Sequence, residues 1–169
     1  PPWQRAEPGG AANFLFAAQH MGLDVLPGGT VGADGFGDMI LNLLREQCID
    51  TRYVSALPGS TSTVVAVLTD QASGEHAFIG HFGTGPEVPY PDGLDGEIAR
   101  VAAVFLAGYT LAEQRMVDLA VRAVERARGE DVPIFLDVGP FMAQVAPELV
   151  RWAVEHAETI LLTEDEIPL

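Results

Sequence analysis

From residue 101 onward the sequence alternates between short apolar runs and longer amphipathic segments. The apolar runs predict strands at 101–107, 132–138 and 159–162, and the amphipathic segments predict helices at 111–128 and 147–156. Strands that alternate with helices through short links pair in parallel, because each helix returns the chain across the sheet. The unbroken apolar character of the strands indicates a sheet covered on both faces. The sequence therefore predicts an α/β fold with a mostly parallel sheet flanked by helices.

The first sixty residues predict a similar alternation. We expect a helix, a strand, a second helix and a second strand at 11–21, 24–31, 38–47 and 52–57. The lone cysteine, Cys48, is expected to be a small buried residue in a helix. These elements extend the predicted α/β pattern toward the start of the chain.

The stretch between residues 61 and 82 has a different texture. The runs 64–69 and 76–82 have the composition of strands, and the cluster 70–75 between them consists of turn-forming residues. Two such runs joined by a short turn make a β-hairpin. We therefore expect an antiparallel hairpin at 61–82 in addition to the parallel sheet.

The charge and the cysteine content exclude some partners and compartments. The 169 residues include 24 acidic and 9 basic side chains, a formal net charge of −15. Such a chain repels phosphate backbones and anionic lipids, so we expect neither nucleic acid nor membrane as a partner. One cysteine cannot form a disulfide within the chain, which favours a reducing, cytoplasmic location. The sequence contains no run of 18 uninterrupted apolar residues, so it predicts no membrane-spanning helix.

Polar residues follow each of the three later predicted strands. Tyr109 follows the first, Asp137 ends the second, and an acidic segment at 163–166 follows the third. Ligands bind beyond the carboxyl ends of parallel strands, so these residues should line one edge of the sheet. The carboxylates have the oxygen ligands that magnesium prefers, although acidic residues also cap helix starts. Tyr109 fits either a sugar contact or a half-buried packing position.

A second group of candidate residues lies at the predicted start of the first helix. Gly9 and Gly10 lack a Cβ, so a ligand can approach their backbone closely. Asn13 follows them, and its amide is suited to cap the helix or to bind a polyol. Other site types have little support. The four histidines are not spaced as metal ligands, and no phosphate-binding loop with its lysine is present. No local Ser–His–Asp set indicates a hydrolase.

The order and spacing of these motifs resemble the PfkB (ribokinase-like) family of carbohydrate kinases, over nearly the whole chain. The glycine pair and Asn13 match residues that contact the acceptor substrate in that family. The glycine-rich turn at 32–37 resembles its next landmark, with Asp34 at the edge of the substrate site. The hairpin at 61–82 looks like its small β-lid. The resemblance implies a doubly wound, mostly parallel sheet with a hairpin lid, and a homodimer through the lid.

The resemblance also implies a chemistry. The segment 163–166 is similar to the family's Asn-x-x-Glu motif, with Glu166 at the glutamate and Thr163 in place of the asparagine. We therefore expect Glu166 and Asp137 on the magnesium side, Tyr109 on the acceptor side, and ATP and Mg²⁺ as cofactors. The expected function is phosphoryl transfer from ATP to a hydroxyl of a sugar or related polyol.

In this family the first strand and its substrate aspartate precede a segment like this one, and the anion hole, catalytic base and adenine site follow it. We therefore expect residues 1–169 to be the acceptor half of a ribokinase-like domain, truncated before its nucleotide half and nearly inactive alone, with the base beyond Leu169. The alternatives are a non-catalytic sugar-binding or regulatory module of the same fold and, more remotely, an unrelated Rossmann-like enzyme.

Overall fold

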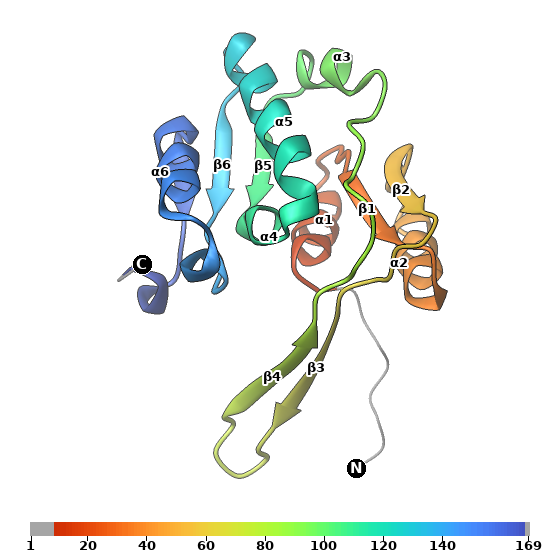
Figure 1. Cartoon of the computed structure of the whole chain (residues 1–169), viewed down its shortest axis with the longest axis vertical. Coiled ribbons are helices and arrows are strands. Elements are labelled where there is room, and N and C mark those ends of the chain that lie inside the picture. Colours follow the sequence, from red (N-terminus) through yellow and green to blue (C-terminus); the bar gives the residue numbers. More distant parts are fainter. Residues whose placement is uncertain (1–8, 168–169) are drawn as a thin grey trace.

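The computed structural model describes residues 9–167 (Figure 1). The helices and strands of this range are, in chain order, α1 (Ala11–His20), β1 (Gly28–Gly32), α2 (Gly35–Glu46), β2 (Tyr53–Leu57), β3 (Val64–Thr69), β4 (His76–His81), α3 (Leu94–Ile98), β5 (Val104–Ala107), α4 (Gly108–Ala112), α5 (Val117–Gly129), β6 (Ile134–Asp137), α6 (Pro147–His156) and β7 (Thr159–Leu161). Short 3₁₀ turns η1 (Gln114–Met116), η2 (Met142–Gln144) and η3 (Glu164–Glu166) complete the order.

The strands form two parallel sheets and one antiparallel hairpin. β5, β6 and β7 pair in that order and in parallel, and β1 pairs in parallel with β2. β3 and β4 pair antiparallel over their whole lengths, and this hairpin projects away from the other strands (Figure 1). The α/β class with parallel sheets and a separate hairpin, expected from the sequence, is confirmed.

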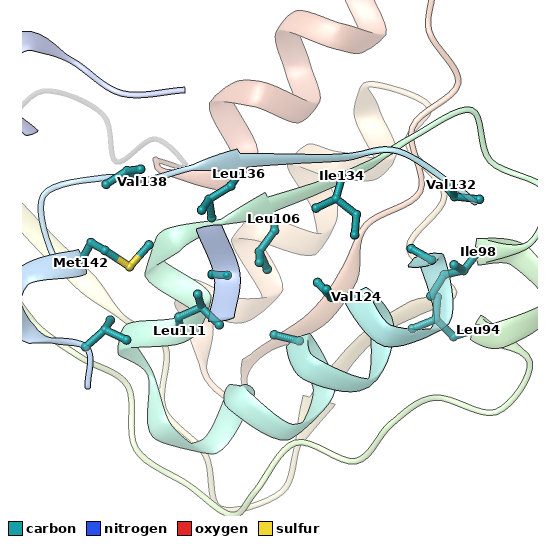
Figure 2. Close-up of a cluster of buried hydrophobic side chains, with 14 of the residues drawn as sticks. Leu94, Ile98, Leu106, Leu111, Val124, Val132, Ile134, Leu136, Val138 and Met142 are labelled. Atoms are coloured by element: carbon teal, nitrogen blue, oxygen red, sulfur yellow. The ribbon is translucent and has the colours of Figure 1, made fainter. Parts of the chain in front are cut away.

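Helices cover both faces of the three-stranded sheet. α5 contacts β5 and β6. The side chain of Val124, on α5, points toward Leu106, Ile134 and Leu136 of those strands (Figure 2). Residues of opposite parity in a strand point to the other face. On that face Phe105 of β5 stacks on Phe14 of α1, with ring centroids 3.7 Å apart, so α1 covers the side opposite α5.

The main core lies between α5 and the sheet. Val124, Ile134 and Leu136 are at most 1% exposed. Burying an aliphatic side chain of this size stabilises the fold by about 1.5–3 kcal/mol. Since Leu136 is fixed in this core, the next residue of β6, Asp137, is held at a defined place at the strand end and on the opposite face.

The predicted bounds of some elements are wrong, for local reasons. The strand predicted at 24–31 begins only at Gly28, after Pro27, which lacks an N–H to pair. The helix predicted at 111–128 is interrupted at Glu113, whose extended conformation ends α4, and the 3₁₀ turn η1 then leads directly into α5. The helix predicted at 38–47 starts earlier, at Gly35, because the carboxylate of Asp34 accepts a hydrogen bond from Gly37 N and caps it.

Cys48 is another correction. It is exposed rather than buried, and its φ of 59° is left-handed, so it ends α2 rather than lying inside it. Its N–H donates to the carbonyl of Arg45, and the N–H of Ile49 donates to that of Leu44. These bonds satisfy carbonyls at the end of α2, a role that glycine usually has.

Candidate functional site

A pocket of about 330 Å³ lies where β5, β6 and β7 end. It is lined by Tyr109, Asp137, Gly139, Pro140, Leu161, Leu162, Thr163 and Glu166. All three segments that the sequence placed at this edge therefore contribute to one cavity. The carboxyl edge of a parallel sheet is where ligands bind in open α/β folds.

A close backbone contact brings two walls of the pocket together. A Cβ on Gly108 would lie 1.9 Å from the carbonyl oxygen of Val138 and 2.8 Å from that of Asp137. Only glycine fits between these groups, so α4 starts directly against the end of β6. The next residue, Tyr109, is thereby held beside Asp137, and both line the pocket.

The charges in the pocket are negative and uncompensated. Burial raises the pKa of the Asp137 carboxyl, and the carboxylate of Glu166 raises it further. The pKa of Tyr109 is raised by burial and then by the same two carboxylates. Among residues 9–167, the pocket lining contains no lysine or arginine. Two mutually repelling carboxylates in a partly buried pocket create a site that a cation would stabilise.

Glu166 has a second role in local structure. Its side chain accepts a hydrogen bond from Thr163 N at 2.8 Å, and the Thr163 side chain accepts one from the backbone of Glu166, which forms a capping box at η3. Of the two interpretations that the sequence left open, the structure shows the helix cap, and the same glutamate also lines the pocket.

These residues fit a magnesium ion that receives its other ligands from elsewhere. Among the residues described here, no group of three or more histidine, cysteine or carboxylate side chains is arranged to hold a metal. Magnesium, however, usually binds to one or two carboxylates and completes its shell with water and substrate phosphates. Asp137 and Glu166 would be those two carboxylates.

The glycine-rich start of α1 lies against the same pocket. Gly10 precedes α1 with φ 53° and ψ −126°, a conformation that favours glycine. A Cβ there would be 4.0 Å from two ring carbons of Tyr109. Gly9, Gly10 and Asn13 are all exposed at this helix start, and none of them is part of the pocket lining. The N-cap of α1 is Gly10, which has no side chain to cap the helix, and Asn13 lies three residues further on, in the first turn.

Asp34 lies outside this pocket lining, at the root of the hairpin. Its carboxylate accepts hydrogen bonds from Ser62 N at 2.7 Å, from Ser62 Oγ at 2.8 Å and from Gly37 N at 2.9 Å. These bonds lower the pKa of Asp34, with the Ser62 backbone as the largest cause. Ser62 Oγ in turn accepts from Gly32 N, so Asp34 ties the hairpin to the end of β1.

Sequence reasoning missed one residue beside the pocket. The ring of Phe141 lies 5.5 Å from that of Tyr109 and 5.1 Å from that of Phe82, which directly follows β4. The sequence signal that could have identified Phe141 as a site residue is its position shortly after the end of β6. Its contact with Phe82 joins distant parts of the chain and has no local pattern.

The chain matches the family model described as "pfkB family carbohydrate kinase" over residues 4–168. No curated protein sequence matches it. None of the helices in the described range is long and apolar enough to cross a membrane.

Several solved structures are similar to this one. They include the fructokinase of Halothermothrix orenii (18% identity, TM-score 0.77, covering 90% of this chain and 55% of that one). The fructokinase of Xylella fastidiosa with bound ATP has 17% identity and a TM-score of 0.75, covering 95% and 51%. The nucleoside kinase of Burkholderia thailandensis in complex with inosine has 19% identity and a TM-score of 0.64, covering 89% and 46%.

At these identities the likeness shows the fold, and the expected ribokinase-like architecture is confirmed. The chain spans about half the length of these solved structures.

Proposed function

Because the chain belongs to the pfkB family of carbohydrate kinases, we propose that it provides the acceptor-binding part of an ATP-dependent kinase. The reaction would transfer the γ-phosphoryl group of ATP to a hydroxyl of a sugar, nucleoside or related polyol. The observation that carries this proposal is the juxtaposition of Tyr109, Asp137 and Glu166 in one pocket, with Gly10 against the tyrosine ring.

The acceptor would lie in the part of the pocket that Tyr109 lines, beside the start of α1. Gly9 and Gly10 permit close approach to the backbone, and the Asn13 amide offers a donor and an acceptor to a hydroxyl. The hydroxyl of Tyr109 offers another polar contact, and its ring one apolar face. Asp34 would shape the outer edge of the acceptor site by fixing the hairpin root through Ser62.

Asp137 and Glu166 would hold Mg²⁺. Bound there, the ion would neutralise phosphate charge, which is a main requirement of phosphoryl transfer. The two carboxylates already repel each other, so a cation would be held more tightly than at an isolated carboxylate. We assign no catalytic base among residues 9–167, and we propose that the base and the nucleotide half lie elsewhere in the whole protein.

We further propose that the enzyme is cytoplasmic and forms a homodimer. The hairpin supports the dimer. On one face of the hairpin large apolar side chains are exposed, among them Leu68 at 52% and Ile79 at 63%. An exposed apolar patch of this kind marks a contact surface. A second copy would cover it, which sedimentation of the wild type and of a Leu68→Lys, Ile79→Lys variant would test.

The experiment that tests the catalytic proposal measures ADP release by the full-length protein. The acceptors would be fructose, ribose, 2-keto-3-deoxygluconate and inosine, each with and without Mg²⁺. We expect Mg²⁺-dependent ADP release with at least one of them. Asp137→Asn should reduce kcat by about 100-fold or more, by the size of effects seen when electrostatic groups are removed. Glu155→Gln, an exposed carboxylate on α6, is the matched control and should retain full activity.

The result against the proposal is the absence of ADP release with every acceptor. If an acceptor then still raised the unfolding temperature of the protein, the chain would be a non-catalytic sugar-binding module instead.

A further inference from the structure

Three aromatic rings connect the hairpin to the pocket. Phe82 directly follows β4, and its ring meets that of Phe141 edge-on, at 5.1 Å between centroids and an interplanar angle of 77°. Phe141 in turn lies 5.5 Å from Tyr109, at 55°. Phe141 is therefore the middle member of a chain whose ends are the hairpin root and a wall of the pocket.

We propose that Phe141 is a positioning residue that fixes the ring of Tyr109 and makes its position depend on the hairpin. The inference rests on the proposed function only for the statement that an acceptor binds at Tyr109. The mechanical link from Phe82 through Phe141 to Tyr109 stands on the ring contacts alone.

Tyr109 is bordered both by backbone and by the side chain of Phe141. Along its Cδ2–Cε2 edge the ring faces backbone, since Cβ atoms on Gly10 and Gly139 would lie 4.0 Å and 3.4 Å from ring carbons of that edge. Gly139 has a left-handed φ of 67°. Phe141 follows it by two residues and supplies a side chain that can tilt, whereas the glycines cannot follow a movement of the ring.

The hairpin end of the link is held differently on its two strands. Before β3, Ser62 is bonded to the carboxylate of Asp34, a polar attachment to the start of α2. After β4, Phe82 is 38% exposed and packs on Phe141. Backbone and hydroxyl bonds between Thr61 and Thr84 keep the two strands together at the root. A tilt of the hairpin about the Asp34 attachment would therefore move Phe82 against Phe141.

The first test does not depend on catalysis. The full-length protein would be labelled with ¹³C-tyrosine, and the Tyr109 ring resonance would be assigned through Tyr109→Phe. No ring contact joins Phe82 to Tyr109 directly, so we expect Phe82→Leu to shift this resonance only through Phe141. In a Phe141→Leu background, Phe82→Leu should leave it unchanged. Phe141→Met, which keeps an unbranched apolar side chain, replaces Phe141→Leu if that variant does not fold.

The matched control is Phe36→Leu, at a comparably exposed phenylalanine on α2. It should not move the Tyr109 resonance in either background. A shift from Phe82→Leu that is equal with and without Phe141 would overturn the proposal, as would the absence of any shift.

The second test measures acceptor kinetics. An edge-to-face aromatic pair changes an equilibrium by about two- to tenfold. We therefore expect Phe82→Leu to raise the KM for the acceptor by about that factor with little change in kcat, and to have no further effect once Phe141 is leucine. Additive effects of the two substitutions on KM would contradict the link. A protein that releases no ADP but shows the Phe141-dependent shift of Tyr109 would refute the proposed function and leave the link intact.

Discussion

Replacing Gly108 with alanine tests the contact that assembles the pocket. The added methyl would lie 1.9 Å from the carbonyl oxygen of Val138, a backbone atom that cannot rotate away. Ordinary van der Waals contact is near 3.5 Å, so α4 and the end of β6 must separate by roughly 1.5 Å. Overpacking of this kind costs about 3 kcal/mol. The unfolding temperature should therefore fall by roughly 6 °C or more.

The same displacement should affect the proposed chemistry, because Tyr109 and Asp137 lie on the two sides of the contact. A misplacement of about 1 Å can cost 100-fold in rate. The control is Gly35→Ala, which is likewise at the first residue of a helix but has nothing within 4 Å of its added methyl. Gly35→Ala should leave the unfolding temperature within a few degrees of the wild type. Equal unfolding temperatures for the two variants would refute the reasoning.

Three further substitutions test the core, the charges of the pocket and the hairpin root. Leu136→Ala removes a side chain with 0% exposure and should lower the free energy of unfolding by about 2–5 kcal/mol in a denaturant titration. Asp137 has a raised pKa, so its charged form opposes folding above the ordinary value of 3.8. Asp137→Asn should therefore be more stable than the wild type at pH 7 in the absence of Mg²⁺, with no difference once the pH is well below 3.8. The pKa of Asp34 is lowered, so its charge stabilises the fold at neutral pH and this contribution is lost as the pH falls through the lowered pKa. Asp34→Asn should accelerate amide hydrogen exchange in β3 and β4 at pH 7. The control Asp38→Asn, in the first turn of α2, should not. Unchanged exchange in the Asp34 variant would show that Asp34 does not hold the hairpin.

The parts of the fold that the sequence predicted well are those with a local pattern. The helix predicted at 147–156 has those bounds in the structure, because its apolar period and its N-terminal proline both lie within the segment. The hairpin was placed within one or two residues for the same reason, since both strands and their turn are contiguous. The alternation after residue 101 was sufficient to place Tyr109, Asp137 and Glu166 at one edge.

What the sequence could not predict depends on contacts between distant residues. The bond from Asp34 to Ser62 turns a residue of the glycine-rich turn into an anchor for the hairpin. The ring contact between Phe82 and Phe141 has no trace in either local pattern. Cys48 is exposed, although cysteine is usually buried, because it occupies the left-handed position that ends α2. Glycine usually fills such a position, and the sequence has none there.

The central claim is that one pocket, lined by Tyr109, Asp137 and Glu166 and bordered by the start of α1, receives both the acceptor and the metal-bound phosphates. The most direct measurement is a crystal structure of the full-length protein with Mg²⁺, a non-hydrolysable ATP analogue and an acceptor from the panel. We expect the acceptor against Tyr109 and beside the start of α1, and the ion on the side of Asp137 and Glu166. An acceptor bound elsewhere, with this pocket filled only by water, would contradict the account.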